Sequence, residues 1–134
     1  MISRFVLTAS QWQEIENHAQ SQIPLEACGL LAGKNDRVEK VITVANQAKS
    51  PARFVMDPYE QLDAFQWIES HGLELVGIFH SHPTGPETAS PTDIAEAAYE
   101  VVYVIVSPHD GYWKAHGFWI EQGRATEVPI EILK

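Results

Sequence analysis

The chain has 134 residues, which fits one domain over residues 1–134, and its 45% apolar and 20% charged residues suffice for an ordinary globular core. With 18 acidic and 9 basic residues the net charge is −9, which argues against a nucleic-acid phosphate backbone as partner. The single cysteine, Cys28, excludes an intramolecular disulfide and a multi-cysteine zinc knuckle.

The N-terminal third of the chain predicts a strand, a helix and a β-hairpin. Residues 5–8 predict a short strand, and the capping box Ser10-Gln11-Trp12-Gln13 is expected to open a helix that Pro24 ends. The apolar face of this helix is expected to comprise Trp12, Ile15, Ala19 and Ile23. An apolar run over 28–32 and an alternating stretch over 38–45, joined by a turn at 34–36, predict the hairpin.

The middle of the chain predicts a second helix and a buried strand. After a polar loop over 46–53, the segment Asp57-Pro58-Tyr59-Glu60 combines an N-cap, a proline at the first helical position and a returning carboxylate. The helix carries Leu62, Phe65 and Ile68 on its apolar face and is expected to stop near Gly72. Residues 74–82 predict a buried strand that delivers two histidines at its end.

The C-terminal part predicts one short helix and three strands. Ser90-Pro91-Thr92-Asp93 repeats the capping pattern and is expected to start a helix through Ala98. The β-branched run 101–106 predicts a central strand, and a turn follows at 108–111. Residues 112–120 and 126–133 predict a closing hairpin around Gln122-Gly123. The order β-α-β-β-α-β-α-β-β-β indicates an α/β protein with a mixed sheet flanked by helices.

The segment from His80 to Asp93 carries the most informative pattern in the chain. His80 and His82 lie two residues apart on an extended segment, so their side chains project to the same side. Asp93 follows His82 by eleven residues and can fold back onto that side. Catalytic zinc typically has three protein ligands and leaves a fourth position for water. The pattern therefore predicts a metal-activated hydrolase.

Such a hydrolase also needs a general base that is not itself a metal ligand, and Glu26, just before an apolar strand, is the candidate. Burial there would raise the pKa of Glu26 and suit it to proton transfer at neutral pH. Each residue also has an ordinary interpretation. His80 and His82 could be core or loop histidines, Ser90 and Asp93 could form only a helix cap, and Glu26 could be an unremarkable acidic residue.

The remaining reactive or bulky side chains are expected to have structural roles. Cys28 has apolar neighbours and is interpreted as a buried small hydrophobe rather than a nucleophile. Surface or structural roles are expected for the histidines that have no partner at ligand spacing, which are His18, His71, His109 and His116. Core packing is expected for the four tryptophans, which are Trp12, Trp67, Trp113 and Trp119.

The set Glu26, His80-Ser81-His82-Pro83, Ser90 and Asp93 resembles the JAMM signature of the MPN/Mov34/PAD-1 metallopeptidases. The family pattern is Glu, a long gap, then His-x-His-x7-Ser-x2-Asp, and here seven residues separate His82 from Ser90 and two separate Ser90 from Asp93. The flanking Pro-x-Glu-x-Cys-Gly-Leu-Leu and His-Pro-x-Gly are also typical, and the resemblance runs from Trp12 to about Trp119. It implies a single JAMM/MPN-type domain whose α/β layout is related to that of the cytidine deaminases.

The resemblance implies a role for each of the five positions. His80, His82 and Asp93 would bind one Zn²⁺ per chain, although two histidines and an aspartate also suit Co²⁺, Mn²⁺ or Fe²⁺. Glu26 would deprotonate the attacking water and then protonate the leaving amine. Ser90 would donate a hydrogen bond to the oxyanion.

The resemblance also implies a substrate class. JAMM proteins include ubiquitin isopeptidases and prokaryotic peptidases that act on ubiquitin-like sulfur carriers. Only 41 residues follow Asp93, which leaves little room for the insertions of eukaryotic isopeptidases, so the chain resembles the compact stand-alone prokaryotic form. The implied reaction is zinc-dependent cleavage at the C-terminal Gly-Gly of a ubiquitin-like or sulfur-carrier protein, whose extended tail could add beside a sheet edge.

Four other functions are weighed against this one. A RadC-like DNA-repair-associated protein has a similar histidine motif but is longer, and the acidic balance disfavours nucleic acid. A non-catalytic MPN assembly scaffold lacks the ligands that this chain retains. A zinc nucleoside deaminase requires His-x-Glu and Pro-Cys-x-x-Cys, which this chain does not contain. A small-molecule amidase with the same chemistry is compatible with the sequence.

The location is predicted from what the sequence lacks. Residues 1–8 do not have the charged and long apolar regions of a signal peptide. No apolar run approaches the roughly 20 residues that cross a bilayer. Together with the single cysteine, this predicts a cytoplasmic protein without a membrane partner.

Overall fold

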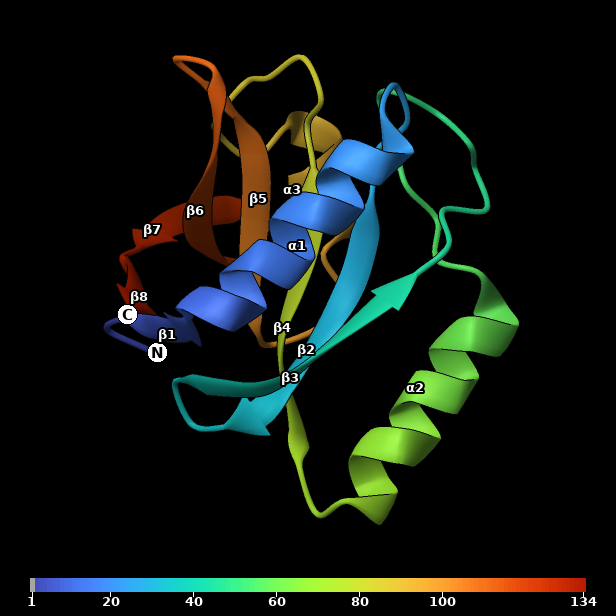
Figure 1. The fold of residues 1–134 in the computed structure, drawn as a ribbon, viewed down its shortest axis with the longest axis vertical. Helices are drawn as coiled ribbons and strands as arrows, with labels where there is room; N and C mark the ends of the chain where they lie inside the picture. The colour runs from blue at the N-terminus through green and yellow to red at the C-terminus, as the bar shows by residue number, and fades with distance from the viewer. Residues whose placement is uncertain (1) are drawn as a thin grey trace.

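The computed structural model describes residues 2–134, which form three helices and one mixed sheet of eight strands (Figure 1). The strands are β1 (Phe5–Thr8), β2 (Cys28–Lys34), β3 (Arg37–Val44), β4 (Glu74–Ser81), β5 (Val102–His109), β6 (Tyr112–Glu121), β7 (Arg124–Val128) and β8 (Ile130–Leu133). The helices are α1 (Ala9–Gln22), α2 (Pro58–Ser70) and α3 (Pro91–Glu96). The predicted α/β class with a mixed sheet and flanking helices is confirmed.

The strands lie in the order β7-β6-β5-β4-β2-β3-β1-β8, so chain neighbours are not always sheet neighbours. The predicted closing hairpin is correct for β6 and β7. The single strand predicted over 126–133 is wrong, because Pro129 cannot donate a ladder hydrogen bond and separates β7 from β8. β8 instead pairs in parallel with β1 at the other end of the strand order, and Phe5 N donates to Pro129 O at 2.9 Å. The sheet is therefore curled, with its two end strands joined through Pro129.

Alternation along the strands produces one hydrophobic core on each face of the sheet. Figure 1 shows α1 crossing one face, with α3 behind β4 and β5. The first core combines residues of α1 with Phe79 of β4 and alternate valines of β5, and the second core combines residues of α2 and α3 with Ile78 of β4. The pairing of β2 with β4 shifts register near Leu75, and from Ile78 onward the even-numbered positions of β4 face α2 and α3. This decides the side on which the histidines project.

The start of α1 differs from the prediction. Thr8, not Ser10, is the N-cap, since Thr8 Oγ1 accepts from Gln11 N at 3.1 Å and Gln11 Oε1 accepts from Thr8 N at 2.9 Å. The chain passes directly from β1 into the helix, and Ser10 lies inside the first turn. Ile15 and Ala19 are buried as expected. Ile23 is 47% exposed, because the helix ends at Gln22.

The other two helices match the predicted positions but not every predicted contact. Asp57 caps α2 and accepts from Tyr59 N and Glu60 N, each at 3.0 Å. The carboxylate of Glu60 does not return to the cap and instead accepts from Ala45 N at 3.1 Å. Leu62 is 54% exposed, and Ala64 and Ile68 provide the buried face of α2. Helix α3 ends at Glu96, two residues before the predicted end.

The tryptophans lie at the margins of the cores rather than inside them. Trp12, Trp113 and Trp119 are half-buried and pack against the first core. Trp67 is also half-buried and stacks on His71, with ring centroids 3.8 Å apart.

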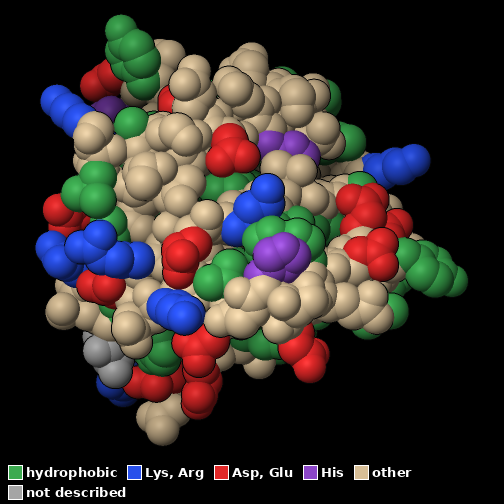
Figure 2. Space-filling view, turned by 60° about the horizontal axis from the view of Figure 1, so that its bottom comes forward, with side chains coloured by type: hydrophobic (Ala, Val, Ile, Leu, Met, Phe, Trp, Pro, Cys, Tyr) green, Lys and Arg blue, Asp and Glu red, His purple; other side chains and the backbone are tan. Residues whose placement is uncertain are grey.

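Two further observations concern possible partners. None of the helices within residues 2–134 is long and apolar enough to span a bilayer. On the face shown in Figure 2, acidic side chains lie among the lysines and arginines. This face therefore has no extended basic surface of the kind that binds a phosphate backbone, and the net charge of the chain is −9.

The cap of α1 gives a direct test of the fold. Thr8→Ala removes the side-chain acceptor for Gln11 N and should cost about 1 kcal/mol, which corresponds to a fall in melting temperature of about 3–6 °C. Ser10→Ala is the matched control and should change the melting temperature by less than about 2 °C, because Ser10 is not the cap. Thermal unfolding followed by circular dichroism measures both, and equal effects would contradict the cap at Thr8.

Candidate metal centre

The two histidines are delivered by the end of β4. His80 lies beside Cys28 of β2 and Ile105 of β5, and the backbone N–H of His82 donates to Val106 O at 2.8 Å. Both imidazoles are buried. Since residues two apart on an extended strand share a face, both rings lie on the side of the sheet that α3 covers.

Asp93 reaches the histidines from the first turn of α3. Ser90 is the N-cap, and its Oγ accepts from Asp93 N at 3.0 Å while Ser90 N donates to Asp93 Oδ2 at 2.9 Å. The predicted capping box is therefore present. This capping box holds the Asp93 carboxylate at the start of α3. From there the carboxylate points to the two histidines.

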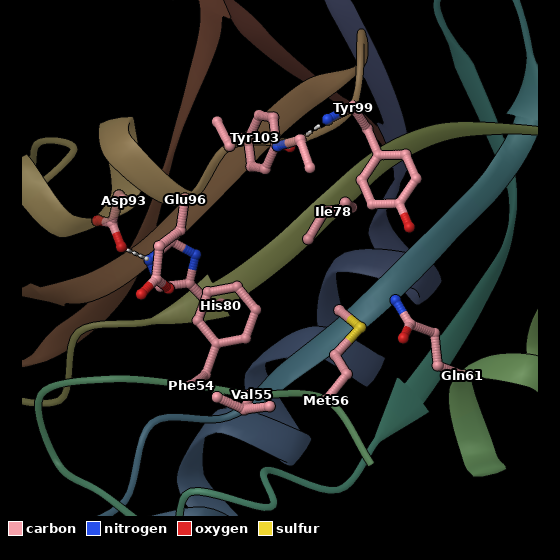
Figure 3. Close-up of a pocket in the computed structure, with 12 residues that line it drawn as sticks. Phe54, Val55, Met56, Gln61, Ile78, His80, Asp93, Glu96, Tyr99 and Tyr103 are labelled. Atoms are coloured by element: carbon pink, nitrogen blue, oxygen red, sulfur yellow. Dashed lines mark hydrogen bonds and ion pairs between the residues drawn. The ribbon is translucent and has the colours of Figure 1, made fainter. Parts of the chain in front are cut away.

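The three candidate ligands converge on one point. Asp93 Oδ1 lies 3.1 Å from His80 Nε2, and Asp93 Oδ2 lies 3.0 Å from His82 Nε2. The two Nε2 atoms are 3.1 Å apart, and one ligand atom from each residue lies within 4.8 Å of the others. Figure 3 shows the Asp93 carboxylate directed at the His80 ring. Two imidazole nitrogens and one carboxylate in this arrangement could hold a metal ion.

Hydrogen bonding and burial set the protonation of the three candidate ligands. His82 Nδ1 lies 2.8 Å from Pro86 O, and because a carbonyl only accepts, this contact places a proton on Nδ1. Nε2 is then the nitrogen that faces Asp93 and His80. Burial disfavours the charge on Asp93, but hydrogen bonds from His80 and His82 outweigh it and hold the Asp93 pKa well below its usual range. Burial lowers the pKa of His80, so this imidazole is held neutral.

The strand register places Glu26 next to these ligands. β2 and β4 are antiparallel, with Cys28 opposite His80, and Ser81 N donates to Ala27 O at 2.9 Å. Continuing the same register puts Glu26 opposite His82 and on the same face. Glu26 is only 3% exposed, and its Oε1 has no hydrogen-bond partner among residues 2–134.

This environment changes the acidity of Glu26. Burial raises its pKa to about 7, while the charge of His82 lowers it and that of Asp93 raises it. A carboxyl group with a pKa near neutrality can both accept and return a proton at physiological pH. The burial expected from the sequence is therefore observed.

Two side chains that the sequence analysis did not assign hold Glu26 in place. Ser81 Oγ accepts from Ala27 N at 2.8 Å, which ties the middle of the His-Ser-His motif to the residue after Glu26. Asn46 Nδ2 donates to Glu26 O at 3.0 Å and to Arg53 O at 3.0 Å. Ser81 lies between the two histidines on the strand, so its side chain points to the opposite face. This alternation is the one sequence signal that could have indicated a structural role for Ser81. Nothing in the polar loop after β3 distinguished Asn46.

A pocket of about 260 Å³ opens beside His80 and Asp93. Figure 3 shows Phe54 lying against the His80 ring, and the two rings stack with centroids 4.6 Å apart. Tyr103 forms part of the wall, and its hydroxyl accepts from Ala98 N at 3.1 Å and Tyr99 N at 3.0 Å. The other lining residues are Val55, Met56, Gln61, Ile78, Glu96, Ala97, Ala98 and Tyr99. The lining is mainly apolar and can enclose an extended chain that approaches the ligands.

The other reactive side chains fall into two groups. Cys28 is fully buried, and burial raises its thiol pKa to about 12, so it is no nucleophile, as predicted. His109 and His116 were expected to have surface or structural roles, and the contacts that they make are ion pairs. Both contact the carboxylate of Glu87, in the loop between His82 and Ser90.

Comparison with known proteins identifies the class. Residues 8–119 match the family described as prokaryotic homologs of the JAB domain. Desampylase of Pyrococcus furiosus is 40% identical over 115 residues, covering 84% of this chain and 79% of that protein. The probable TtuB-protein conjugate cleaving protease of Thermus thermophilus is 43% identical over 122 residues, covering 90% and 78%. The CysO-cysteine peptidase of Mycobacterium tuberculosis is 34% identical over 121 residues, covering 87% and 83%.

A solved structure supports the same assignment. The solution structure of a Desulfitobacterium hafniense protein superimposes with a TM-score of 0.88 at 35% identity, covering 97% of this chain and 93% of that one. The chain belongs to the prokaryotic JAB domain family, the JAMM/MPN group that its signature resembles. The structure brings His80, His82 and Asp93 together, with Glu26 and Ser90 beside them, while the catalytic and ligand roles of these five residues remain predictions.

The acidity of Glu26 predicts a pH-dependent effect on stability. Its folded pKa lies above the ordinary value of 4.5, so folding stability is lost as the pH rises from the unfolded pKa through about 7. Glu26→Gln removes this titration. In metal-free protein, the gain in melting temperature of the variant over the wild type should be larger at pH 8 than at pH 5, by about 5 °C or more. The same difference at both pH values in thermal unfolding would show that the Glu26 pKa is not raised.

Proposed function

We propose that this protein is a zinc-dependent peptidase that cleaves the amide bond following the C-terminal Gly-Gly of a ubiquitin-like or sulfur-carrier protein. The observation that carries the proposal is the convergence of His80, His82 and Asp93 beside the buried carboxylate of Glu26. The relatives named desampylase and conjugate cleaving protease support the substrate class. The lone buried thiol of Cys28 is consistent with a cytoplasmic location, which is part of the proposal.

The donor set fits zinc. His80 and His82 offer imidazole nitrogens, Asp93 offers an anionic oxygen, and the hydrogen bond from His82 Nδ1 to Pro86 O is the kind of outer contact that orients a metal-binding histidine. When bound, the ion supplies a Lewis acid that makes water nucleophilic at neutral pH and polarises the scissile carbonyl.

Glu26 performs the proton transfers. Its carboxylate takes a proton from the attacking water as the new C–O bond forms at the scissile carbon. The resulting carboxylic acid then gives that proton to the leaving nitrogen as the C–N bond breaks. A pKa of about 7 suits both steps, since neither protonation state of Glu26 is strongly favoured at neutral pH.

Ser90 stabilises the charge that develops on the carbonyl oxygen. Its Oγ accepts a hydrogen bond from Asp93 N, so its own O–H remains free to donate. The cap also fixes the Ser90 backbone, so the donor is oriented before the reaction begins. Loss of one such donor typically costs on the order of 10²–10³ in rate.

The burial of the site supports a substrate without side chains at the scissile bond. His80 and Glu26 are almost completely covered, so a branched side chain would collide with the walls. Two glycines present only backbone, and an extended tail can pass between the loop carrying Phe54 and the segment after α3 that borders the pocket. A folded carrier would remain outside and present its tail.

Metal content tests the centre and separates ligands from the base. We expect about one zinc per wild-type chain by elemental analysis after zinc addition and dialysis, and none in His80→Ala/His82→Ala. Glu26→Gln should retain the zinc and lose about 10²–10⁴-fold in turnover, because only the proton transfer is removed. Loss of zinc in Glu26→Gln would make Glu26 a ligand and contradict its role as base. A wild type without metal would indicate a non-catalytic scaffold.

The tail of the substrate tests the recognition mode. A ubiquitin-like or sulfur-carrier protein fused through its Gly-Gly terminus to a reporter should be cleaved after the second glycine, as mass spectrometry of the products would show. Deleting the Gly-Gly, or replacing both glycines by valine, should abolish cleavage because bulkier residues do not fit the buried site. Unchanged cleavage of the deleted fusion would refute recognition of the tail, even if the protein is a peptidase.

A further inference from the structure

The loop over residues 83–89 connects the two halves of the metal centre. It begins directly after His82, at the end of β4, and it ends at Ser90, the cap of α3 that carries Asp93. The position of this loop over the sheet therefore affects how the histidines and the aspartate meet. Within it, Gly85 N donates to His82 O at 2.9 Å, which closes a tight turn after the second histidine.

Glu87 connects this loop to β5 and β6 through its carboxylate. Glu87 Oε1 lies 2.9 Å from His109 Nδ1, at the end of β5, and 3.4 Å from His116 Nε2, in β6. One carboxylate oxygen thus contacts two imidazoles from neighbouring strands. We call this contact set the Glu87 bridge.

The surrounding charges fit this arrangement. His116 Nδ1 lies 3.5 Å from Glu127 Oε1 of β7, and His109 Nε2 lies 3.4 Å from Asp110 Oδ2. Each imidazole therefore has a carboxylate near both ring nitrogens. Both imidazoles are thus held between two carboxylates, one of which is Glu87.

The bridge is one residue away from the metal centre. Glu87 directly follows Pro86, whose carbonyl oxygen is the 2.8 Å partner of His82 Nδ1. That contact holds the proton of His82 on Nδ1 and leaves Nε2 as the metal-binding atom. Movement of Glu87 away from His109 and His116 would carry Pro86 O with it and release the second tautomer of His82.

We propose that Glu87 is a positioning residue for the metal centre, acting through Pro86 O to orient His82. The inference rests on the proposed function, since it takes His82 as a metal ligand. It adds a residue outside the JAMM signature, and it gives His109 and His116 a role in the site although neither reaches the metal.

The bridge should affect metal affinity more than stability. The side chains of Glu87 and His109 are 36% and 46% exposed, and ion pairs with that exposure contribute little to folding. Outer-shell contacts of a metal-binding histidine, in contrast, typically change metal affinity by 10–100-fold. Glu87 acts one residue beyond such a contact, so the lower end of this range is expected.

The experiment compares Glu87→Ala with a matched control, Glu127→Ala, which removes the other carboxylate contact of His116 without touching the loop. Zinc dissociation constants are measured by competition with a chromophoric chelator. Glu87→Ala should weaken zinc binding about 10-fold, Glu127→Ala should stay within about twofold of the wild type, and both metal-free variants should melt within about 3 °C of it. Equal zinc affinity in Glu87→Ala and wild type, or an equal loss in both variants, would overturn the proposal.

A second measurement does not depend on metal. In metal-free protein labelled with ¹⁵N in its histidine rings, NMR at pH 8 should show His82 protonated at Nδ1 in the wild type and in Glu127→Ala, and a mixture of tautomers in Glu87→Ala. An unchanged His82 tautomer in Glu87→Ala would refute the positioning role of Glu87.

If wild-type protein binds no zinc, the proposed function fails and the His82 tautomer alone decides the role of Glu87. A second zinc in the wild type that disappears in Glu87→Ala would make Glu87 a ligand and overturn its positioning role.

Discussion

The antiparallel register between β2 and β4 is the constraint on which the site depends. Cys28 lies opposite His80, and Ser81 clamps Ala27 through both its backbone N–H and its hydroxyl. A shift of one residue would turn Glu26 to the opposite face of the sheet and place it in the core under α1. The same shift would remove the side-chain acceptor of Ala27 N, leaving a buried donor unpaired. The register that the sheet favours is therefore the one that brings the Glu26 carboxylate to the candidate metal ligands.

The buried polar atoms of the site reduce the folding stability, and the apolar packing of the rest of the sheet offsets this loss. Glu26 Oε1 and His80 Nδ1 are buried without hydrogen-bond partners within residues 2–134, and a raised pKa at Glu26 means that its ionised form destabilises the native state. The second core lies on the same face of the sheet as these groups and includes Ile78, Tyr103 and Ile105. An unpaired, buried carboxylate oxygen such as Glu26 Oε1 is expected beside a site where a bound ligand supplies the missing partner.

The sequence predicted the parts of the site that depend on local spacing and missed those that depend on tertiary contacts. The shared face of His80 and His82 follows from the two-residue periodicity of a strand. The Ser90–Asp93 cap follows from the capping-box pattern at a helix start, so both were predictable. The cap of α1 was misplaced because Ser10 and Thr8 both begin plausible capping boxes, and only the junction with β1 selects Thr8. The crossing of β8 to β1 and the partners of His109 and His116 join residues far apart in the chain, for which one sequence has no signal.

Helix α3 shows how weak local structure can hold a candidate metal ligand, Asp93, in a fixed position. It has six residues and no fully buried side chain, and a helix this short has little intrinsic stability in water. Its order comes from its ends: the Ser90 cap before it, and the Tyr103 hydroxyl that accepts from two backbone N–H groups just after it. Because Asp93 both completes the cap and faces His80 and His82, a cation bound there would stabilise the helix that presents the ligand. Order in α3 and occupancy of the centre would then be coupled.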